Sequence, residues 1–251
     1  MARIIGIVSG KGGVGKTTLT TNLGVALSNL KRKVTIVDCN ITTSHLGYHF
    51  DFFYYPKTLN QVLREEISLE EASYYHESGV RIVPASLSIE ELAGVDISKL
   101  KNLNFDDSEI VLLDSAPGLG REAMSVLNAC NEVIFVTLPF MNAVSDVIKC
   151  SRIVKYLGIN PLGIVLNMWR KDCYELDEKD VEELTGIKVI AKIPFDLEVQ
   201  KSLIYRIPTV LYNPFSPASL EINKLAAWLV GEKYTPPKGK IFFKILRLFR
   251  R

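Results

Sequence analysis

The sequence predicts an α/β fold in which a mostly parallel, twisted sheet carries helices on both of its faces. Two observations lead to this prediction. Apolar, β-branched runs recur along the chain, and most are separated by stretches of helical length, as in sheets that are buried on both faces. The first run is also followed by a glycine-rich loop and a helical pattern. The runs lie at residues 4–8, 34–37, 80–83, 110–113, 133–137, 163–166 and 189–193.

Length and composition set the expected organisation of the chain. With 251 residues and 47% hydrophobic content, it can bury one large α/β core. We therefore expect one domain at residues 1–230, a linker at 231–240 and a separate helix at 241–251. No apolar run approaches the roughly 20 residues of a membrane-spanning helix, and the first strand begins without a signal-peptide pattern. These features predict a cytoplasmic protein.

The glycine-rich loop after the first strand predicts binding of a nucleotide phosphate. Its glycines let backbone N–H groups turn inward around an anion, and the helix predicted at residues 19–30 adds the positive end of its dipole. Lys16 is expected to reach the β- and γ-phosphates, and the Thr17 hydroxyl to bind Mg²⁺. The loop comprises Gly10, Lys11, Gly12, Gly13, Val14, Gly15, Lys16, Thr17 and Thr18. This strand, loop and helix predict a P-loop NTPase.

A second lysine, Lys11, stands at the start of the loop, where an ordinary P-loop does not require one. With this lysine the loop resembles that of the deviant-Walker-A ATPases, the MinD/ParA family, and the N-terminal residues 1–5 are most similar to its MinD-like members. The resemblance covers essentially the whole chain. It implies ATP and Mg²⁺ as cofactors and an ATP-bound homodimer, in which Lys11 reaches the nucleotide of the partner subunit.

The second strand ends at Asp38, and residues 38–41 occupy the position of the family's switch I. Relatives that hydrolyse ATP efficiently usually carry Asp-X-Asp here, whereas this chain has Asn40 as the second polar residue. An amide cannot take a proton or offer a full negative charge at neutral pH. Losing one water-positioning group costs roughly 2 to 4 kcal/mol, or about 10² to 10³ in rate. Lys11, Lys16 and Asn40 form the candidate catalytic set.

Two interpretations of Asn40 remain open at this point. In the first, hydrolysis is slow and the ATP-bound state is long-lived. In the second, the Asn40 amide positions the attacking water adequately, since phosphoryl transfer relies mainly on positioning.

The fourth run ends in Asp114 and continues into residues 115–120, Ser-Ala-Pro-Gly-Leu-Gly. This segment resembles a Walker B strand that enters switch II. Asp114 is expected to hold Mg²⁺ through water, and the glycines leave the segment loose enough to rearrange around a γ-phosphate. The candidate metal residues are therefore Thr17, Asp38 and Asp114.

Two later strand ends resemble the family's adenine-contacting positions. They are Asn167, after the sixth run, and Pro194, after the seventh. Both signals are weaker than the P-loop, because asparagine after a strand is also an ordinary turn former.

The segment at residues 51–55, just beyond switch I, reads Asp-Phe-Phe-Tyr-Tyr. Burial in the core is the default interpretation of such an aromatic segment. The alternative is a partner surface that responds to the bound nucleotide. The cysteines show neither paired spacing nor a close histidine, so we expect four buried thiols. These are Cys39, Cys130, Cys150 and Cys173.

The C-terminal segment predicts an amphipathic helix at a membrane surface. When residues 241–251 are placed on a helix, the apolar side chains share one arc and the basic ones lie opposite. The segment is about 16 Å long, so it can lie among lipid headgroups but not cross the bilayer. Packing of the helix on its own body is the alternative. The apolar set is Ile241, Phe242, Ile245, Leu246, Leu248 and Phe249, and the basic set is Lys244, Arg247 and Arg251.

Charge is distributed unevenly along the chain. Six bases and no acids lie between residues 238 and 251, while the formal net charge of the whole chain is only +2. The body is therefore mildly acidic, which disfavours nucleic acid as a partner. The last helix of the body is predicted at residues 218–230, with Ser216 and Pro217 at its start and Gly231 at its end.

These features predict an ATP-dependent, dimerising switch of the MinD-like kind. It would lie in the cytoplasm, bind the inner face of the cell membrane through its tail, and position another protein assembly under the control of an activating partner. One alternative is a ParA-like DNA-partitioning ATPase. Another is an adaptor that Asn40 leaves locked in its ATP-bound state.

Overall fold

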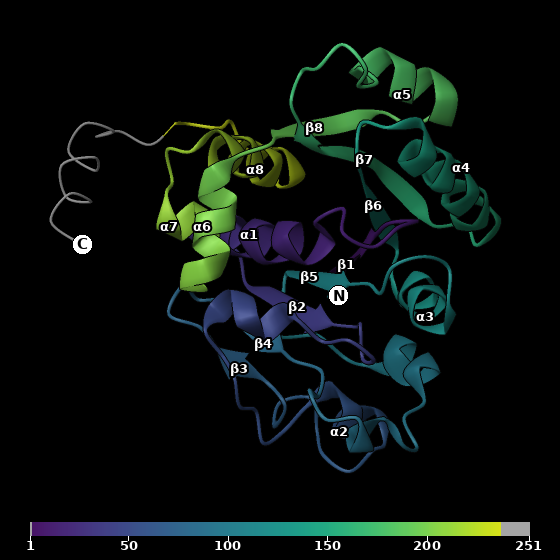
Figure 1. The fold of residues 1–251 in the computed structure, drawn as a ribbon. Coiled ribbons are helices and arrows are strands. Elements are labelled where there is room, and N and C mark those ends of the chain that lie inside the picture. Colours follow the sequence, from purple (N-terminus) through teal and green to yellow (C-terminus); the bar gives the residue numbers. More distant parts are fainter. Residues whose placement is uncertain (1, 237–251) are drawn as a thin grey trace, which may run out of the picture.

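The structure is a computed structural model and describes residues 2–236. The predicted helix at 241–251 and residues 237–240 of the predicted linker lie outside the described residues. Within residues 2–236 the strands form one eight-stranded sheet in the order β3-β4-β2-β5-β1-β6-β7-β8 (Figure 1). Every neighbouring pair is parallel except β3 and β4. The predicted mostly parallel α/β sheet is confirmed.

The strands are β1 (Arg3–Val8), β2 (Val34–Asp38), β3 (Tyr74–Tyr75), β4 (Arg81–Val83), β5 (Ile110–Asp114), β6 (Glu132–Thr137), β7 (Asn160–Trp169) and β8 (Val189–Pro194). The α-helices are α1 (Lys16–Asn29), α2 (Leu59–Leu63), α3 (Arg121–Ala129), α4 (Met141–Tyr156), α5 (Glu178–Thr185), α6 (Leu197–Tyr205), α7 (Thr209–Tyr212) and α8 (Pro217–Leu229). Over the same residues, 2–236, the 3-10 helices are η1 (Leu46–Phe50), η2 (Glu90–Leu92) and η3 (Ile97–Asn102).

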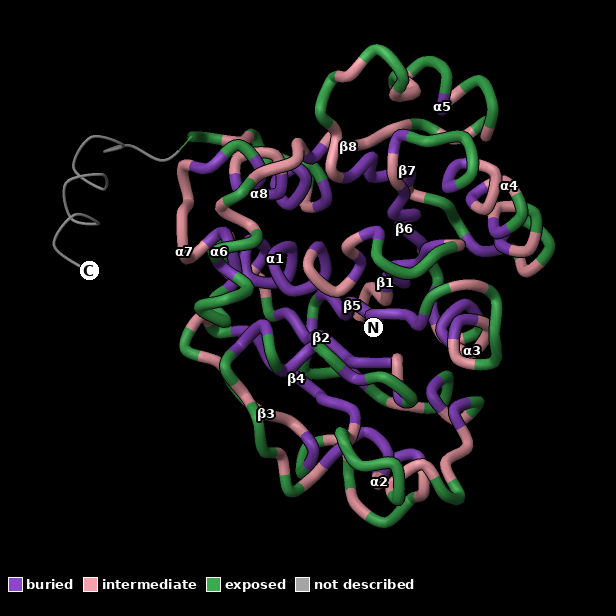
Figure 2. The backbone as a smooth tube through the Cα atoms, in the orientation of Figure 1, coloured by how far each residue is buried: buried purple, intermediate pink, exposed green. Residues whose placement is uncertain are grey.

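Helices cover both faces of the sheet, as the apolar runs predict. Successive side chains of a strand point to opposite faces, and in β5 Val111 and Leu113 pack with α2, α3, α4 and α5. On the other face, Leu112 packs with α1, α7 and α8. Figure 2 shows the central strands buried along their length between these two layers. Near-continuous apolar runs are what two buried faces require.

Most predicted boundaries agree with the structure to within one or two residues, and the exceptions have local causes. Helix α1 begins at Lys16, three residues before its predicted start, because the helix continues into the P-loop itself. Strand β7 begins at Asn160 and not at residue 163, and it bends at Gly163, where φ is +152° and a side chain would collide with Ile190. The two-residue edge strand β3 was not predicted.

The last helix of the body forms as predicted. The Ser216 side chain accepts a hydrogen bond from the Ser219 backbone N–H at 3.2 Å, and Pro217 occupies the first turn of α8. Gly231 follows the helix with φ +69°, a conformation that glycine adopts without strain. Among the described residues, no helix has the length and apolar character needed to cross a bilayer.

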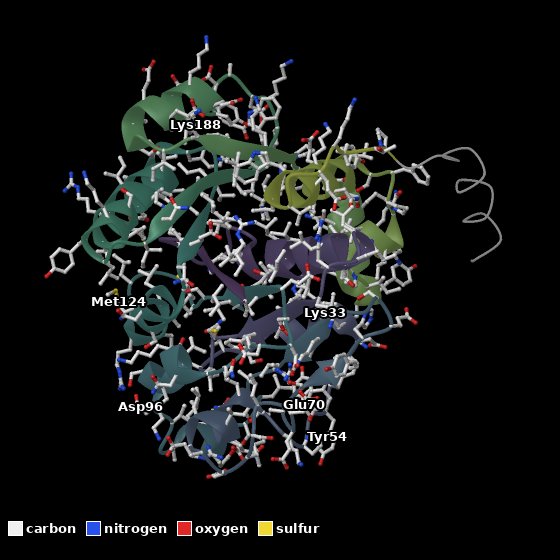
Figure 3. All side chains as sticks on the ribbon, turned by 180° about the vertical axis from the view of Figure 1, so that it is seen from behind. Lys33, Tyr54, Glu70, Asp96, Met124 and Lys188 are labelled. Carbon is white, nitrogen blue, oxygen red and sulfur yellow. The ribbon has the colours of Figure 1, made fainter. Side chains whose placement is uncertain are left out.

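Two predictions about burial are wrong in part. Cys39, Cys130 and Cys150 are buried, but Cys173 is exposed in the segment between β7 and α5. In the aromatic segment, Phe53 is 45% exposed and Tyr54 83% exposed, so the default of core burial fails for both. Figure 3 shows Tyr54 at the periphery of the molecule.

The exposed position of Phe53 has a local explanation. The Arg206 guanidinium lies 4.1 Å from the centre of the Phe53 ring, at the end of α6, and the Tyr48 ring meets Phe53 edge-on. A cation and a second ring stabilise one face of the ring without removing it from water. Phe53 and Tyr54 therefore lie on the outside of the molecule, while Phe52 packs against the core.

Candidate functional site

The candidate site lies where β1, β2 and β5 end side by side. These strands are parallel neighbours, and Asp38 at the end of β2 pairs in register with Asp114 at the end of β5. The P-loop follows β1 at the same edge. Ligands in such sheets bind at the carboxyl ends of the strands, so the structure gathers the predicted residues of three separate segments at one place.

The P-loop backbone has a shape that only glycine adopts without strain. Gly13 has φ +77° and Gly15 has φ +91°, in the region that disfavours side chains. A Cβ at Gly15 would also collide with the amide nitrogen of Asn167, and one at Gly10 would collide with Asp146 on α4. Gly15 is therefore required by both backbone conformation and a close neighbour, Gly13 by conformation alone and Gly10 by its neighbour alone.

Lys16 begins α1 and is 7% exposed. Burial lowers the pKa of its ammonium group, and the nearby Asp114 carboxylate opposes that shift. A buried cation without a full counter-charge is costly, so a negatively charged ligand at the loop would stabilise it. This electrostatic arrangement suits the phosphate-binding role predicted for Lys16.

Asp114 is held by two hydroxyl groups of α1. The Thr17 hydroxyl donates to Asp114 Oδ2 at 2.6 Å, and the Thr20 hydroxyl donates to Oδ1 at 3.1 Å. The carboxyl group is 1% exposed, and burial raises its pKa to about 6. A hydroxyl and a carboxylate in contact are the hard oxygen donors that Mg²⁺ prefers. The residues present therefore fit a Mg²⁺ ion shared between Thr17, Asp114 and phosphate oxygens.

Asp38 is also buried, but its oxygens organise switch I. Oδ1 accepts from the Asn40 backbone N–H at 3.1 Å, while Oδ2 accepts from the Ser44 hydroxyl at 2.7 Å and from the Leu46 N–H at 3.3 Å. Burial raises the pKa of Asp38 to about 7, and the Asp114 charge adds to that shift. Both oxygens hold the loop, so the predicted metal role of Asp38 stays a prediction.

The Asn40 side chain closes a turn within switch I. Its Nδ2 donates to the Thr43 carbonyl at 2.8 Å, and its Oδ1 accepts from the Thr43 hydroxyl at 3.1 Å. Both ends of the amide are therefore engaged within the loop. To bind a water molecule, Asn40 must share or break one of these hydrogen bonds.

Asn167 lies directly behind the P-loop. Its amide donates to the Val14 carbonyl at 2.7 Å, and the residue is 8% exposed. Pro194 ends β8 opposite Trp169, and the Arg170 guanidinium stacks 3.8 Å from the centre of the neighbouring Phe195 ring. The adenine contacts predicted for Asn167 and Pro194 stay predictions, and the structure adds a supporting role for Asn167.

Sequence reasoning missed several residues that shape this site. Thr20 supports Asp114, Ser44 supports Asp38, and Glu122 at the start of α3 accepts hydrogen bonds from Thr42. Thr20 could have been found, because it lies one helical turn after Lys16 on the same face. The contacts of Ser44 and Glu122 depend on loop geometry, which periodicity does not encode.

Comparison with known proteins assigns the family. The model described as "CobQ/CobB/MinD/ParA nucleotide binding domain" matches residues 5–209, most of the chain. The chain belongs to this family. Within it, the chain is MinD-like, in agreement with the resemblance of its P-loop.

The relatives of the MinD-like chain include curated sequences and solved structures. An uncharacterised ATP-binding protein of Methanocaldococcus jannaschii is 34% identical over 93% of this chain and 90% of its own length. The septum site-determining protein MinD of Pyrococcus horikoshii, solved with Mg-ADP, is 33% identical with a TM-score of 0.88, over 91% of this chain and 96% of that chain. The cell division ATPase MinD of Pyrococcus furiosus is 33% identical with a TM-score of 0.89, over 92% and 99% respectively.

Proposed function

We propose that this MinD-like protein is an ATP- and Mg²⁺-dependent switch that dimerises with ATP bound, attaches to the membrane through its C-terminal segment and positions another protein assembly. The observation that carries the proposal is the contact of Thr17 with the buried Asp114 carboxylate beside Lys16. Metal, phosphate and cation sites then coincide at one edge of the sheet. The Mg-ADP complex of the Pyrococcus horikoshii relative supports this nucleotide chemistry.

The residues of the site divide the work of hydrolysis. Backbone N–H groups of the P-loop and the Lys16 ammonium would bind the β- and γ-phosphates, and Thr17 and Asp114 would hold Mg²⁺. When bound, Mg²⁺ neutralises charge that develops on the phosphate oxygens. Lys11 is exposed on the loop, and we assign it to the nucleotide of the second subunit. Asn40 orients the attacking water when its amide is released from a hydrogen bond to Thr43.

Slow hydrolysis is the form of the activity that the site supports best. The Asn40 amide is bonded at both ends to Thr43 and carries no charge with which to polarise a water molecule. The Asn40 amide would therefore have to position that water while it is already hydrogen-bonded to Thr43. If hydrolysis does not occur at all, the protein is the adaptor that stays in its ATP-bound state.

Exposed apolar side chains at the site support a dimer through this edge. Leu119 in switch II is 37% exposed, and Phe140 and Met141 at the start of α4 are 38% and 55% exposed. Switch II touches the P-loop, since the Gly118 N–H donates to the Ser9 carbonyl at 3.0 Å. Burial of these side chains against a second copy would stabilise the dimer by about 25 cal/mol per Å².

Membrane attachment rests on the sequence of residues 241–251, which lie outside the described residues. One short amphipathic helix with basic residues gives weak, reversible binding to anionic lipid. A dimer presents two such helices, and the second binds at high effective concentration, so avidity rises by about 10² or more. The nucleotide would thereby set membrane residence. We place the protein in the cytoplasm and at the inner face of the cell membrane.

The positioned assembly is inferred from the relatives. Several curated relatives carry the name septum site-determining protein MinD, among them one from Guillardia theta that is 30% identical over 93% of this chain and 90% of its own length. We infer a related role, in placing a division site or another polar assembly, together with an activating protein partner. DNA is the less favoured partner because the body is mildly acidic.

Sedimentation with anionic liposomes tests the proposed switch. We expect the full chain to pellet with ATP and Mg²⁺ and to stay in solution with ADP and Mg²⁺, while a chain truncated after Pro237 stays in solution with both. Equal pelleting with both nucleotides would contradict nucleotide control. Absence of pelleting with either nucleotide would contradict membrane attachment.

A further inference from the structure

Switch I is fastened to the helix that follows switch II. The Thr42 backbone N–H donates to Glu122 Oε1 at 3.2 Å, and the Thr42 hydroxyl donates to the same oxygen. Glu122 is the second residue of α3 and comes directly after the glycine-rich switch II segment. A single carboxylate oxygen of Glu122 therefore joins switch I to the start of α3, where switch II ends. Both switch segments flank the phosphate site.

The turn at residues 40–43 of switch I is also attached to the site by hydrogen bonds. Asn40 closes the turn through Thr43, and its backbone N–H donates to Asp38 at the end of β2. The turn thus has a fixed base on the sheet and an outer attachment on α3. Any movement of Glu122 relative to Asp38 must displace the Asn40–Thr43 turn.

Switch II connects this attachment to the P-loop. Gly118 has φ +79°, and its N–H donates to the carbonyl of Ser9, the residue between β1 and the P-loop. The switch I turn also lines a pocket of about 230 Å³, in which Thr42, Thr43 and His45 lie with Ser86 and Ile89. The turn borders open space there, and its contact with α3 is the one through Thr42 and Glu122.

We propose that Glu122 is a positioning residue for ATP hydrolysis, which acts through Thr42 by fastening switch I to α3 so that Asn40 stays over the phosphate site. This inference rests on the proposed ATPase activity. Glu122 serves here as a hydrogen-bond acceptor and does not touch the reacting atoms. A glutamine at this position can still accept from Thr42, whereas an alanine cannot.

Hydrogen–deuterium exchange of the full chain tests the fastening directly. We expect Glu122→Ala to raise exchange in peptides that cover residues 40–46, and Glu122→Gln to leave it close to wild type. Glu71→Ala is a matched control, because Glu71 Oε2 accepts from the Ser68 N–H and hydroxyl at 2.9 and 3.0 Å in the same manner. Unchanged exchange in Glu122→Ala would overturn the inference.

Steady-state hydrolysis tests the consequence. We expect Glu122→Ala to lower kcat about tenfold with little change in KM, the rate equivalent of one hydrogen bond. Thr42→Val should lower kcat in the same direction, and the double variant should fall no further than Glu122→Ala alone. Glu122→Gln should keep most of the wild-type kcat.

Three results would overturn the role of Glu122. A wild-type kcat in Glu122→Ala would show that the contact with Thr42 does not affect hydrolysis. A Glu122→Gln as slow as Glu122→Ala would show that accepting a hydrogen bond from Thr42 is not the role of Glu122 in turnover. No turnover in the wild-type chain would overturn the proposed activity and this role together. In that case the exchange measurement would still report whether the fastening exists.

Discussion

On one side of the nucleotide site, Lys16 and Asp114 are 7% and 1% exposed and belong to a helix and a strand of the core. On the other side, Thr42 and Thr43 are exposed in a loop that hydrogen bonds close locally. The first side, which we call the rigid wall, is fixed by packing of the whole sheet. The second side, the switch I wall, is held by a few hydrogen bonds that can break one at a time. Nucleotide binding should therefore be robust, and the timing of hydrolysis adjustable.

The largest expected effect comes from the rigid wall. Lys16→Ala should weaken ATP binding by about 10² or more, because it removes the buried cation that faces the phosphates. Burial already lowers the pKa of Lys16, so the nucleotide-free variant should melt no lower than wild type. Isothermal titration calorimetry and thermal unfolding measure the two effects, with the exposed Lys33→Ala as the control. A large loss of stability with unchanged affinity would reverse the assignment of Lys16.

The next effect concerns η1, which joins switch I to the rigid wall. His49 of η1 faces the Thr21 hydroxyl of α1, and burial lowers its pKa to about 4. Its folded pKa lies below the unfolded value, so its stability contribution is full above pH 6.5 and is lost as the pH falls towards 4. The His49 contribution alone should lower the unfolding free energy by on the order of 2 to 3 kcal/mol over that range. Asp38 and Asp114, whose folded pKa values lie above the unfolded ones, change it in the opposite direction.

Urea unfolding at a series of pH values checks this prediction. The unfolding free energy of wild type minus that of His49→Gln should fall by the His49 contribution between pH 6.5 and 4, since glutamine does not titrate. If the unfolding free energy of His49→Gln depended on pH as that of wild type does, His49 would not be the group responsible for this pH dependence.

A smaller effect is expected from the residue behind the P-loop. Asn167→Ala removes the bond to the Val14 carbonyl and should weaken Mg-ADP binding about tenfold, the effect of losing one buried hydrogen bond. Asn128→Ala removes an amide-to-carbonyl bond of the same kind in α3 and should leave affinity unchanged. Equal effects of both substitutions would argue that Asn167 has no special part in shaping the loop.

The same contrast explains what the sequence could predict. The strands and the P-loop were found because long apolar runs and glycine spacing are local patterns that a buried parallel sheet requires. The contacts of Ser44 and Glu122 join residues of irregular loops, so no period marks them. Phe53 and Tyr54 were expected in the core on hydrophobicity alone, yet Phe53 packs against Arg206, a partner 153 positions away in the chain.

The start of β7 and the presence of β3 could not be predicted for a similar reason. Strand β7 starts before Gly163 because the strand continues through a bend beside β8, and glycine within an apolar run reads as a break. The edge strand β3 has only two residues and pairs with β4 alone. Both features depend on the neighbouring strand, which the local sequence does not contain.

The central claim is that the rigid wall sets nucleotide binding and switch I sets the rate of hydrolysis. Single-turnover hydrolysis at saturating ATP, compared between the wild-type chain and Asn40→Asp, tests it most directly. Aspartate still accepts from the Thr43 hydroxyl but turns its second oxygen away from the Thr43 carbonyl, which frees a carboxylate oxygen for water. We predict a rate at least about tenfold higher with ATP affinity unchanged within about twofold. An unchanged rate, or an affinity that shifts as much as the rate, would contradict the account.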